Sequence, residues 1–206
     1  IAVYMLALPY LFAKDFKKYS IFCIIAALFH QTALVGIPLY FLFTLPVNKK
    51  TISLMAGVGL LGGYLLPRIL MFASTVEERY GTYLEYEGGG EMFTVFYVII
   101  TIFFLMQRKN IKEEAKSRYD IMLMMLMLGS VIYLVVTLSH VYGEVSRFAM
   151  YFQISVIFLW AELFKNGVRK ANSLIYSACI FGSLVYFYVY LSKIGHIAPY
   201  ILNTTF

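Results

Sequence analysis

Long apolar blocks separated by short polar connections make up this chain. The apolar blocks are Ile1–Ala13, Tyr19–Leu45, Ile52–Phe72, Met92–Gln107, Ile121–Ser139, Phe148–Phe164 and Ser173–Ser192. A membrane-crossing helix needs about 20 predominantly apolar residues, with a range of about 17–25. The pattern therefore predicts an all-α polytopic membrane protein, in which Tyr19–Leu45 is long for one span and Met92–Gln107 is short.

Composition supports the membrane assignment and excludes several other classes. Of the 206 residues, 61% are hydrophobic and 14% are charged, and the mean hydropathy is +0.77. A soluble domain is about 45–50% apolar and about a quarter charged, and at this length it could not bury so much apolar side chain. A soluble enzyme, a disordered protein and a nucleic-acid-binding domain are thereby excluded.

The beginning of the chain lies inside an apolar block. It opens with Ile1 and has neither the basic segment nor the small-residue cleavage site of a signal peptide. We therefore expect the C-terminal part of a longer membrane protein, truncated at its N-terminus. Because the sequence has no internal repeat or long linker, residues 1–206 are expected to form a single transmembrane domain.

The distribution of basic residues distinguishes two topologies for Tyr19–Leu45. If this block crosses the membrane once, the 17 Lys and Arg residues divide almost evenly between the two sides. If it crosses twice, 13 of the 17 share one side. The segments that carry them are Lys14–Lys18, Val47–Lys50, Arg108–Asp120 and Lys165–Lys170. Cytoplasmic loops are enriched in Lys and Arg, so the double crossing is favoured. We therefore expect seven to eight spans, including a short helical hairpin at 19–46. The net charge of +6 then reflects the orientation of the protein in the membrane.

The hairpin has an unusual consequence for the membrane surface. Arms of roughly 14 and 17 residues rise only about 21 and 25 Å, whereas the hydrocarbon core is about 30 Å thick. The tip is expected at Phe29–Thr32, where His30 and Gln31 are the strongly polar residues. A tip held below the surface would form a recess open to the outside.

Polar groups in or beside a membrane are costly and therefore mark candidate functional residues. His30 and Gln31 could bind a sugar hydroxyl or a phosphate, or they could simply tie the hairpin arms together. Arg147 begins a late span, with Glu144 before it and Tyr151 one helical turn later. A guanidinium suits bidentate phosphate binding. The alternatives are an interfacial anchor or an ion pair between Arg147 and Glu144.

Two further candidates lie on the predicted outer side. The segment from Glu77 to Glu87 has three Tyr and four acids, with Arg79 and Tyr83 among its residues. Aromatic faces and carboxylates suit carbohydrate, although an ordinary solvated loop has the same composition. Arg68 near the end of its span could bind a specific phosphate or reach lipid phosphates nonspecifically. The sequence has no metal-ligand or cofactor motif. The segment Arg108–Asp120 is expected to be a solvated connector. The Met-rich stretch 122–127 is expected either to face lipid or to form part of the core.

Two motifs resemble the EpsG family of bacterial membrane proteins. The first is Ala26-Ala-Leu-Phe-His-Gln-Thr-Ala-Leu-Val-Gly-Ile-Pro-Leu-Tyr40, which contains the family's Ala-x-x-x-His-x-(Ser/Thr)-Ala-Leu pattern. The second is Ser146-Arg-Phe-Ala-Met-Tyr-Phe152, which is similar to its Arg-x-x-x-Tyr-Phe pattern. The resemblance extends over essentially the whole chain, and His30, Arg147 and Tyr151 occupy motif positions.

The resemblance implies a role in exopolysaccharide, capsule or O-antigen production. Family members are thought to act like Wzy polymerases, which join repeat units carried on undecaprenyl diphosphate at the outer face of the bacterial cytoplasmic membrane. On this interpretation the protein is a membrane glycosyltransferase whose fold could be a GT-C-like helical bundle. At the motif positions, His30 and Arg147 would be catalytic and Tyr151 would bind substrate. The motif does not fix the acidic residue: Glu144 is the candidate catalytic acidic residue, with the acids of the Glu77–Glu87 segment as the alternative. From their position on the predicted outer side, the further candidates for substrate binding are Gln31, Arg68, Arg79 and Tyr83. The expected partners are the lipid-linked oligosaccharide, membrane lipid and other export proteins, with no cofactor, metal or nucleic acid.

Other functions remain open at the level of sequence. A non-catalytic lipid-linked oligosaccharide translocator or export subunit is the main alternative, but a translocator should line both leaflets with polar residues. A membrane acyltransferase would also place His near lipid, but many such enzymes use cytoplasmic acyl-CoA. The candidate polar residues here gather on the predicted outer side, which favours the polymerase.

Overall fold

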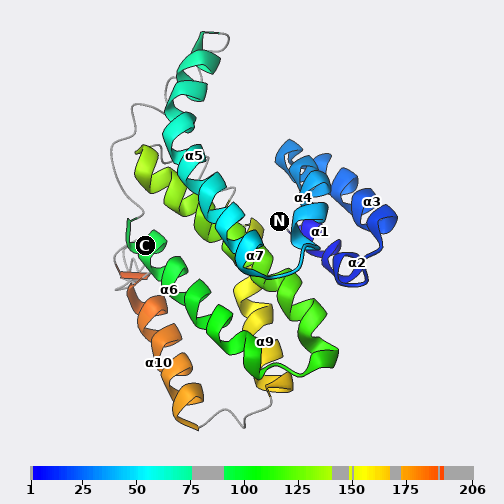
Figure 1. Ribbon diagram of the computed structural model, residues 1–206, viewed down its shortest axis with the longest axis vertical. Coiled ribbons are helices and arrows are strands. Elements are labelled where there is room, and N and C mark those ends of the chain that lie inside the picture. The colour runs from blue at the N-terminus through cyan, green and yellow to red at the C-terminus, as the bar shows by residue number, and fades with distance from the viewer. Residues whose placement is uncertain are drawn as a thin grey trace, which may run out of the picture. The chain divides into compact units, whose positions relative to one another are not determined.

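A computed structural model describes residues 2–75, 91–140, 149, 151–167, 173–189 and 191–192. Within these residues all the regular elements are helices (Figure 1). The α-helices are α1 (Ala2–Met5), α2 (Leu8–Phe12), α3 (Phe16–Ala27), α4 (Gly36–Phe43), α5 (Lys49–Ser74), α6 (Glu91–Gln107), α7 (Glu113–Ser139), α9 (Ser155–Asn166) and α10 (Ser173–Val189), and the short 3-10 helices are η1 (Gln31–Val35) and η3 (Arg108–Asn110).

The chain divides into two compact units, Ile1–Asn166 and Gly167–Phe206. The described part of the second unit consists mainly of α10, which exposes large apolar side chains such as Phe181 and Tyr188. All the other helices belong to the first unit.

Helix α7 lies at the centre of the first unit. Helices α4, α5, α6 and α9 all pack on it. Its segment from Ile121 to Met127 is buried around the whole helix circumference, with each side chain at most 6% exposed. A helix that is apolar on every side is stable in such a surrounded position. The Met-rich stretch is therefore core rather than lipid-facing.

Helix α5 runs parallel to α7 and approaches it closely. Gly59 and Gly62 of α5 lie against Val131 and Val135 of α7, in the same order along both helices. A Cβ atom at Gly59 would come within 2.8 Å of Cγ1 of Val131. Glycine is thus required here to let the two backbones approach.

Helix α6 runs antiparallel to α7 and is joined to it by hydroxyl contacts. Thr94 near the start of α6 lies 2.6 Å from Thr137 near the end of α7, measured between the two Oγ1 atoms. Further along, Oγ1 of Thr101 lies 2.7 Å from Oγ of Ser130. These contacts satisfy polar groups that would otherwise be costly inside an apolar helix pair.

Helix α9 also runs antiparallel to α7. Nε of Arg118 lies 2.8 Å from Oε1 of Glu162, and the backbone N–H of Lys112 donates to the carbonyl of Asn166 at 3.0 Å. The beginning of α7 therefore lies beside the end of α9.

These directions bring the basic connections to one end of the first unit. The start of α5, the end of α6, the start of α7 and the end of α9 all meet there. We call this the basic end, with described residues 47–50, 108–118 and 165. Residues 14–18 lie beside them, because the Phe16 ring packs 5.0 Å from the Tyr40 ring near the end of α4, and α4 leads into residues 47–50. This agrees with the grouping of basic segments predicted from the hairpin topology.

Local sequence explains where several helices begin and end. The Asp15 carboxylate accepts from the backbone N–H of Lys18 at 3.1 Å and caps α3. This hydrogen bond holds the pKa of Asp15 below its usual range. The Asn48 side chain accepts from the backbone N–H of Thr51 at 3.0 Å, at the beginning of α5. His140 adopts a left-handed conformation with φ of 55° and ends α7.

Two of the described helical segments, Glu91–Asn110 and Glu113–Ser139, are long and apolar enough to cross a membrane. The first exposes a continuous apolar stripe, Val95, Ile99, Ile102 and Met106, each more than half exposed. Such a stripe at helical spacing is typical of a face that contacts lipid.

The structure corrects the predicted connector Arg108–Asp120. Only residues 108–112 lie outside α6 and α7, because α7 begins at Glu113 and not at Ile121. Two acidic residues in its first turn favour helix there. A bidentate pair between Arg108 and Asp120, with N–O distances of 2.6 and 2.8 Å, holds this segment in place.

Candidate functional site

The segment predicted as a hairpin consists of two short helices that pack on each other, α3 and α4. The Phe16 ring at the start of α3 lies 5.0 Å from the Tyr40 ring and 5.1 Å from the Phe41 ring, between centroids. Both partners are near the end of α4, so the helices are antiparallel and the chain reverses between residues 28 and 35. A helical reversal is thus present in the segment predicted as a hairpin at 19–46, but its helices run from Phe16 to Ala27 and from Gly36 to Phe43 and are shorter than the predicted arms.

Tyrosine hydroxyls hold the interior of the hairpin together. The Tyr19 hydroxyl donates to the carbonyl of Gly36 at 3.1 Å and lies 3.0 Å from the Tyr4 hydroxyl. Tyr4 and Tyr19 are at most 2% exposed. A Cβ atom at Gly36 would lie 3.0 Å from Cε2 of Tyr4 and 3.2 Å from the Cys23 sulfur. Gly36 therefore allows α4 to contact both α3 and the Tyr4 ring.

Tyr4 also connects the hairpin to the second sequence motif. Its ring lies 5.7 Å from the Tyr151 ring in an edge-to-face arrangement. Beside this contact, the Phe43 and Phe152 rings lie 5.6 Å apart. The hairpin and the segment around Tyr151, more than a hundred residues apart in the chain, therefore meet in one cluster. It consists of the rings of Tyr4, Tyr19 and Tyr151 together with Gly36, which packs against Tyr4 and Tyr19. We call it the tyrosine cluster.

Sequence reasoning did not single out Tyr4. A single Tyr in an apolar N-terminal block has no distinctive spacing, and only its contacts with both motif segments identify it. Tyr151, which was predicted to bind substrate, is 9% exposed in the cluster.

His30 lies at the hairpin tip, as predicted. Its backbone N–H donates to the carbonyl of Ala26 at 3.1 Å, and its carbonyl accepts from Ala33 at 3.0 Å. These bonds hold the residue between α3 and η1. The side chain is exposed, as are those of Leu28 and Phe29 beside it. Gln31 is the first residue of η1.

Arg68 lies on the exposed surface of α5. Its guanidinium lies 4.0 Å from the centroid of the Tyr64 ring, and Nη1 donates to the Tyr64 carbonyl at 3.0 Å. Contacts within its own helix thus orient Arg68. The other predicted site residues lie outside the described residues: Arg79, Tyr83, Glu144 and Arg147.

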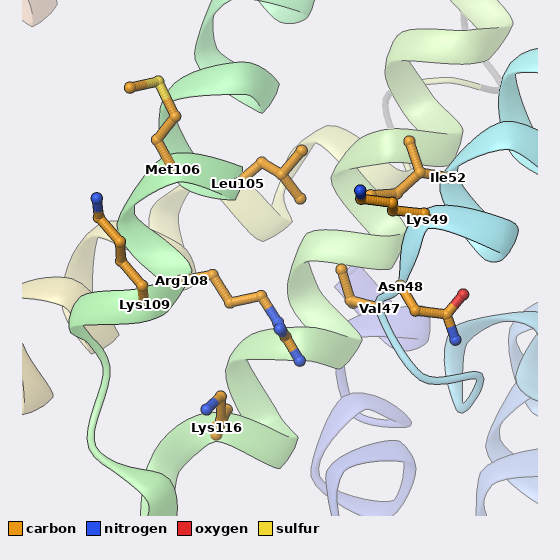
Figure 2. Close-up of a pocket in the computed structure, with 9 residues that line it drawn as sticks. All are labelled: Val47, Asn48, Lys49, Ile52, Leu105, Met106, Arg108, Lys109 and Lys116. Carbon is orange, nitrogen blue, oxygen red and sulfur yellow. The ribbon is translucent and has the colours of Figure 1, made fainter.

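The basic end contains a pocket that sequence reasoning missed. Its volume is about 460 Å³ and it lies between the Val47–Ile52 segment and the Leu105–Lys116 segment (Figure 2). Cationic side chains from both segments line it: Lys49, Arg108, Lys109 and Lys116. The abundance of Lys and Arg in these two connections was visible in the sequence, but their meeting around one pocket was not.

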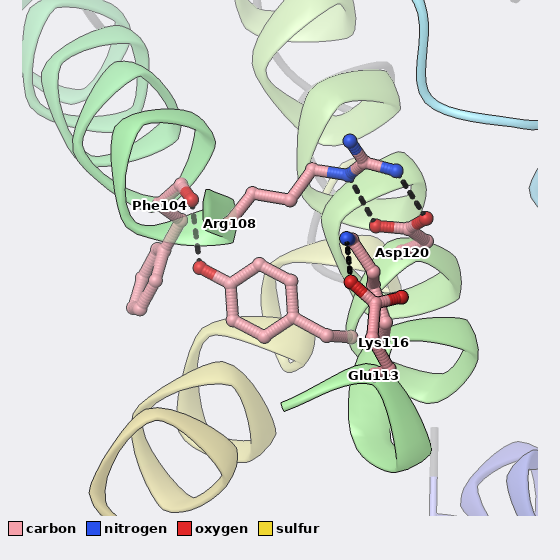
Figure 3. A network of polar contacts seen from close by, with 6 residues as sticks. Phe104, Arg108, Glu113, Lys116 and Asp120 are labelled. Atoms are coloured by element: carbon pink, nitrogen blue, oxygen red, sulfur yellow. Dashed lines mark hydrogen bonds and ion pairs between the residues drawn. The ribbon is translucent and has the colours of Figure 1, made fainter. Parts of the chain in front are cut away.

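Ion pairs organise the floor of this end (Figure 3). Arg108 donates to both carboxylate oxygens of Asp120, and Lys116 pairs with Glu113. The Tyr119 hydroxyl donates to the Phe104 carbonyl at 2.7 Å and fastens α7 to α6. The two hydrogen bonds to Asp120 therefore fix the position of the Arg108 guanidinium, which is permanently charged.

Glu162 of α9 lies at the basic end and has charged and polar partners there. Its carboxylate is 12% exposed and pairs with Arg118 of α7, and it accepts from the side-chain amide of Asn166. The residue thus stabilises the contact between α7 and α9.

Comparison with known proteins identifies the family. A family model described as the EpsG family matches residues 1–202. No curated protein and no solved structure matches the chain. The match agrees with the resemblance of the two sequence motifs and, together with two helices apolar and long enough to span a membrane, indicates a membrane protein. Because the match extends over nearly the whole chain, the protein belongs to the EpsG family.

Proposed function

We propose that this protein joins oligosaccharide repeat units carried on undecaprenyl diphosphate, in the production of an exopolysaccharide, capsule or O-antigen. Family membership fits a polysaccharide polymerase role in general. The observation that carries the proposal is the tyrosine cluster, in which the His30-containing segment and the segment that follows Arg147 meet through Tyr4. A reaction between two substrates requires such convergence of groups from distant parts of the chain.

In this proposal the chain is one transmembrane domain with seven to eight spans in the bacterial cytoplasmic membrane. The basic end faces the cytoplasm, in line with the positive-inside rule. Helix α3 has 12 residues, which rise about 18 Å, and this is less than the hydrocarbon thickness of about 30 Å. The tip with His30 would therefore lie within the outer half of the membrane, and the exposed Leu28 and Phe29 beside it suit such a position.

The chemistry requires no ATP, because the lipid diphosphate is itself the leaving group. Arg147 would bind the diphosphate and stabilise the negative charge that develops on it. His30 or Glu144 would accept the proton of the acceptor hydroxyl. Gln31, Arg68, Arg79 and Tyr83 would contact the sugars or the lipid phosphates, and Tyr151 would contribute through the tyrosine cluster.

The charge geometry at Arg147 provides the principal test. A guanidinium bridges two phosphate oxygens, whereas a Lys ammonium acts as a point charge. Arg147→Ala should lower polymer formation by about 10²–10³-fold, and Arg147→Lys should be strongly impaired at equal membrane abundance. Polymer length and yield would be measured in cells that lack their own copy. The matched control is Arg118→Lys, because Arg118 makes an ion pair with Glu162 at the basic end and has no role in the proposed reaction. Near-normal polymer from Arg147→Lys would contradict the diphosphate role.

A second comparison tests the hairpin tip. His30→Ala should abolish polymer formation while leaving the protein in the membrane, because the imidazole is exposed and its removal leaves no cavity. The neighbouring Phe29 side chain is also exposed, so Phe29→Ala is the matched control and should retain activity. Normal polymer from His30→Ala would remove this residue from the site.

The proposed orientation is tested by labelling in whole cells. Gly89→Cys should react with a membrane-impermeant thiol reagent, and Lys112→Cys should not. Lys112 is exposed at the basic end, so lack of labelling there would reflect the membrane barrier rather than burial. The unsubstituted chain provides the background from its own two Cys. Labelling of Lys112→Cys in intact cells would reverse the proposed orientation.

A further inference from the structure

The pocket at the basic end retains positive charge after its internal ion pairs are formed. Arg108 and Lys116 are balanced by Asp120 and Glu113. Lys49 and Lys109 also line the pocket and are exposed, and in the part of the chain that the structure describes neither is within an ion pair. The pocket therefore suits a ligand that carries one or two negative charges.

The guanidinium of Arg108 is fixed in a position where it can contact such a ligand. Its Nε and Nη2 donate to Asp120, which leaves Nη1 outside that pair (Figure 3). The side chain extends from the end of α6 into the pocket that the Val47–Ile52 segment borders (Figure 2). A guanidinium fixed by a carboxylate loses little side-chain entropy when it binds a phosphate oxygen.

The remaining wall of the pocket is apolar. Ile52, Leu105 and Met106 line it together with the cations. Met106 is 64% exposed and is the last member of the apolar stripe on α6 that begins at Val95. A headgroup in the pocket could therefore continue into an acyl chain along α6. A soluble phosphate would use the cations and leave this apolar surface unused.

We propose that this pocket binds the phosphate of an anionic phospholipid from the leaflet at the basic end, with Lys49, Lys109 and Arg108 around the phosphate and an acyl chain along α6. Basic pockets between membrane helices on the cytoplasmic side bind anionic lipid headgroups by the same combination of charge and apolar contact. The pocket is separate from the proposed polymerase site. The pocket lies at the basic end, where α3 begins, whereas His30 lies beyond the other end of α3. Its failure would leave the polymerase proposal unaffected.

The test measures lipid affinity on the purified full chain in a neutral detergent. Short-chain dioctanoyl phosphatidylglycerol is titrated, and thermal unfolding is followed through the fluorescence of Trp160, the one Trp of the sequence. Trp160 packs on Phe103 and Phe104 of α6, so its signal reports the fold of this region. The lipid should raise the midpoint of unfolding in a concentration-dependent way, because it binds only the folded state.

Charge removal inside and outside the pocket then separates specific binding from general attraction. The double variant Lys49→Gln, Lys109→Gln should weaken affinity for the lipid by roughly 10- to 30-fold, about fivefold for each Lys. The control Lys17→Gln, Lys112→Gln removes the same charge from exposed positions at the same end and should change affinity by about twofold or less. Both should match the parent's midpoint without lipid.

Four results would overturn the proposal. They are unchanged affinity in the Lys49→Gln, Lys109→Gln variant, an equal loss in the control variant, equal stabilisation by dioctanoyl phosphatidylcholine, and equal stabilisation by inorganic phosphate at the same concentration. The last result would assign the pocket to soluble phosphate, and the third would reduce it to an apolar contact.

Discussion

The close approach at Gly36 provides a sharp test of the hairpin packing. Gly36 has ordinary right-handed helical angles, with φ of −56° and ψ of −34°, so its backbone does not require glycine. Only space requires it, because an added Cβ would lie 3.0 Å from Tyr4 Cε2 and 3.2 Å from both the Cys23 sulfur and the Tyr19 hydroxyl. Carbon atoms in ordinary contact are about 3.5–4.0 Å apart. Gly36→Ala must therefore displace α4 or its neighbours by a few tenths of an ångström.

The neighbours have little freedom to move. Tyr4, Tyr19 and Cys23 are at most 2% exposed, and the Tyr19 hydroxyl is committed to both the Gly36 carbonyl and Tyr4. Overpacking a core costs about 1–3 kcal/mol, and weakening one hydrogen bond adds about 0.5–1.5 kcal/mol. Ala gains at most about 1 kcal/mol over Gly in a helix, and less at the first residue of α4. We expect a net loss of about 1–3 kcal/mol, or roughly 2–12 °C in the midpoint of thermal unfolding.

The assay is thermal unfolding in detergent followed by Trp160 fluorescence, with Gly57→Ala as the matched control. Gly57 is in the interior of α5, and a Cβ there would meet nothing within 4 Å. Gly57→Ala should therefore be neutral or stabilising by up to about 1 kcal/mol. If Gly36→Ala unfolds at or above the parent's temperature while Gly57→Ala behaves as expected, the close packing of α4 on Tyr4 and α3 is wrong.

Two further predictions concern the packing of α7. Gly59→Ala should destabilise the protein by about 1–3 kcal/mol, because the added methyl group would press on Val131. In a double-mutant cycle measured by thermal unfolding, the added substitution Val131→Ala should recover part of that loss. Strictly additive effects of the two substitutions would mean that the two side chains do not meet. Asp120→Asn should cost about 1–3 kcal/mol, between the values for exposed and buried pairs, because it leaves the half-buried Arg108 without its carboxylate. Glu113→Gln, at a carboxylate that is 82% exposed, should change the same unfolding midpoint little, and an equal loss in the two variants would show that the bidentate pair has no special weight.

The sequence by itself determined the helical class and much of the order of the elements. Each predicted apolar block contains helix in the described structure, because a long run of apolar residues satisfies its backbone locally through helical hydrogen bonds. The polar residues at 30–31 marked the reversal of the hairpin, and the distribution of Lys and Arg grouped the connections that the structure brings to one end. The resemblance of the two motifs to the EpsG family agrees with the family match over residues 1–202.

The sequence determined less of the candidate site. It placed His30 at the hairpin tip, where the structure has it, because polarity within an apolar block is a local signal. The roles assigned to Arg79, Tyr83, Glu144 and Arg147 remain predictions, since these residues lie outside the described part of the chain.

Only the tertiary structure decided which side chains meet. Tyr4 joins the two motif segments, and Lys49 lines one pocket with Arg108, through contacts between residues far apart in the chain. The charged residues 113–120 form the first turns of α7 instead of a solvated connector, because partners across the fold, such as Arg108 for Asp120, satisfy them. Helical periodicity and polarity act over a few residues and can be read locally, whereas these pairings depend on how complementary helix surfaces fit together in space.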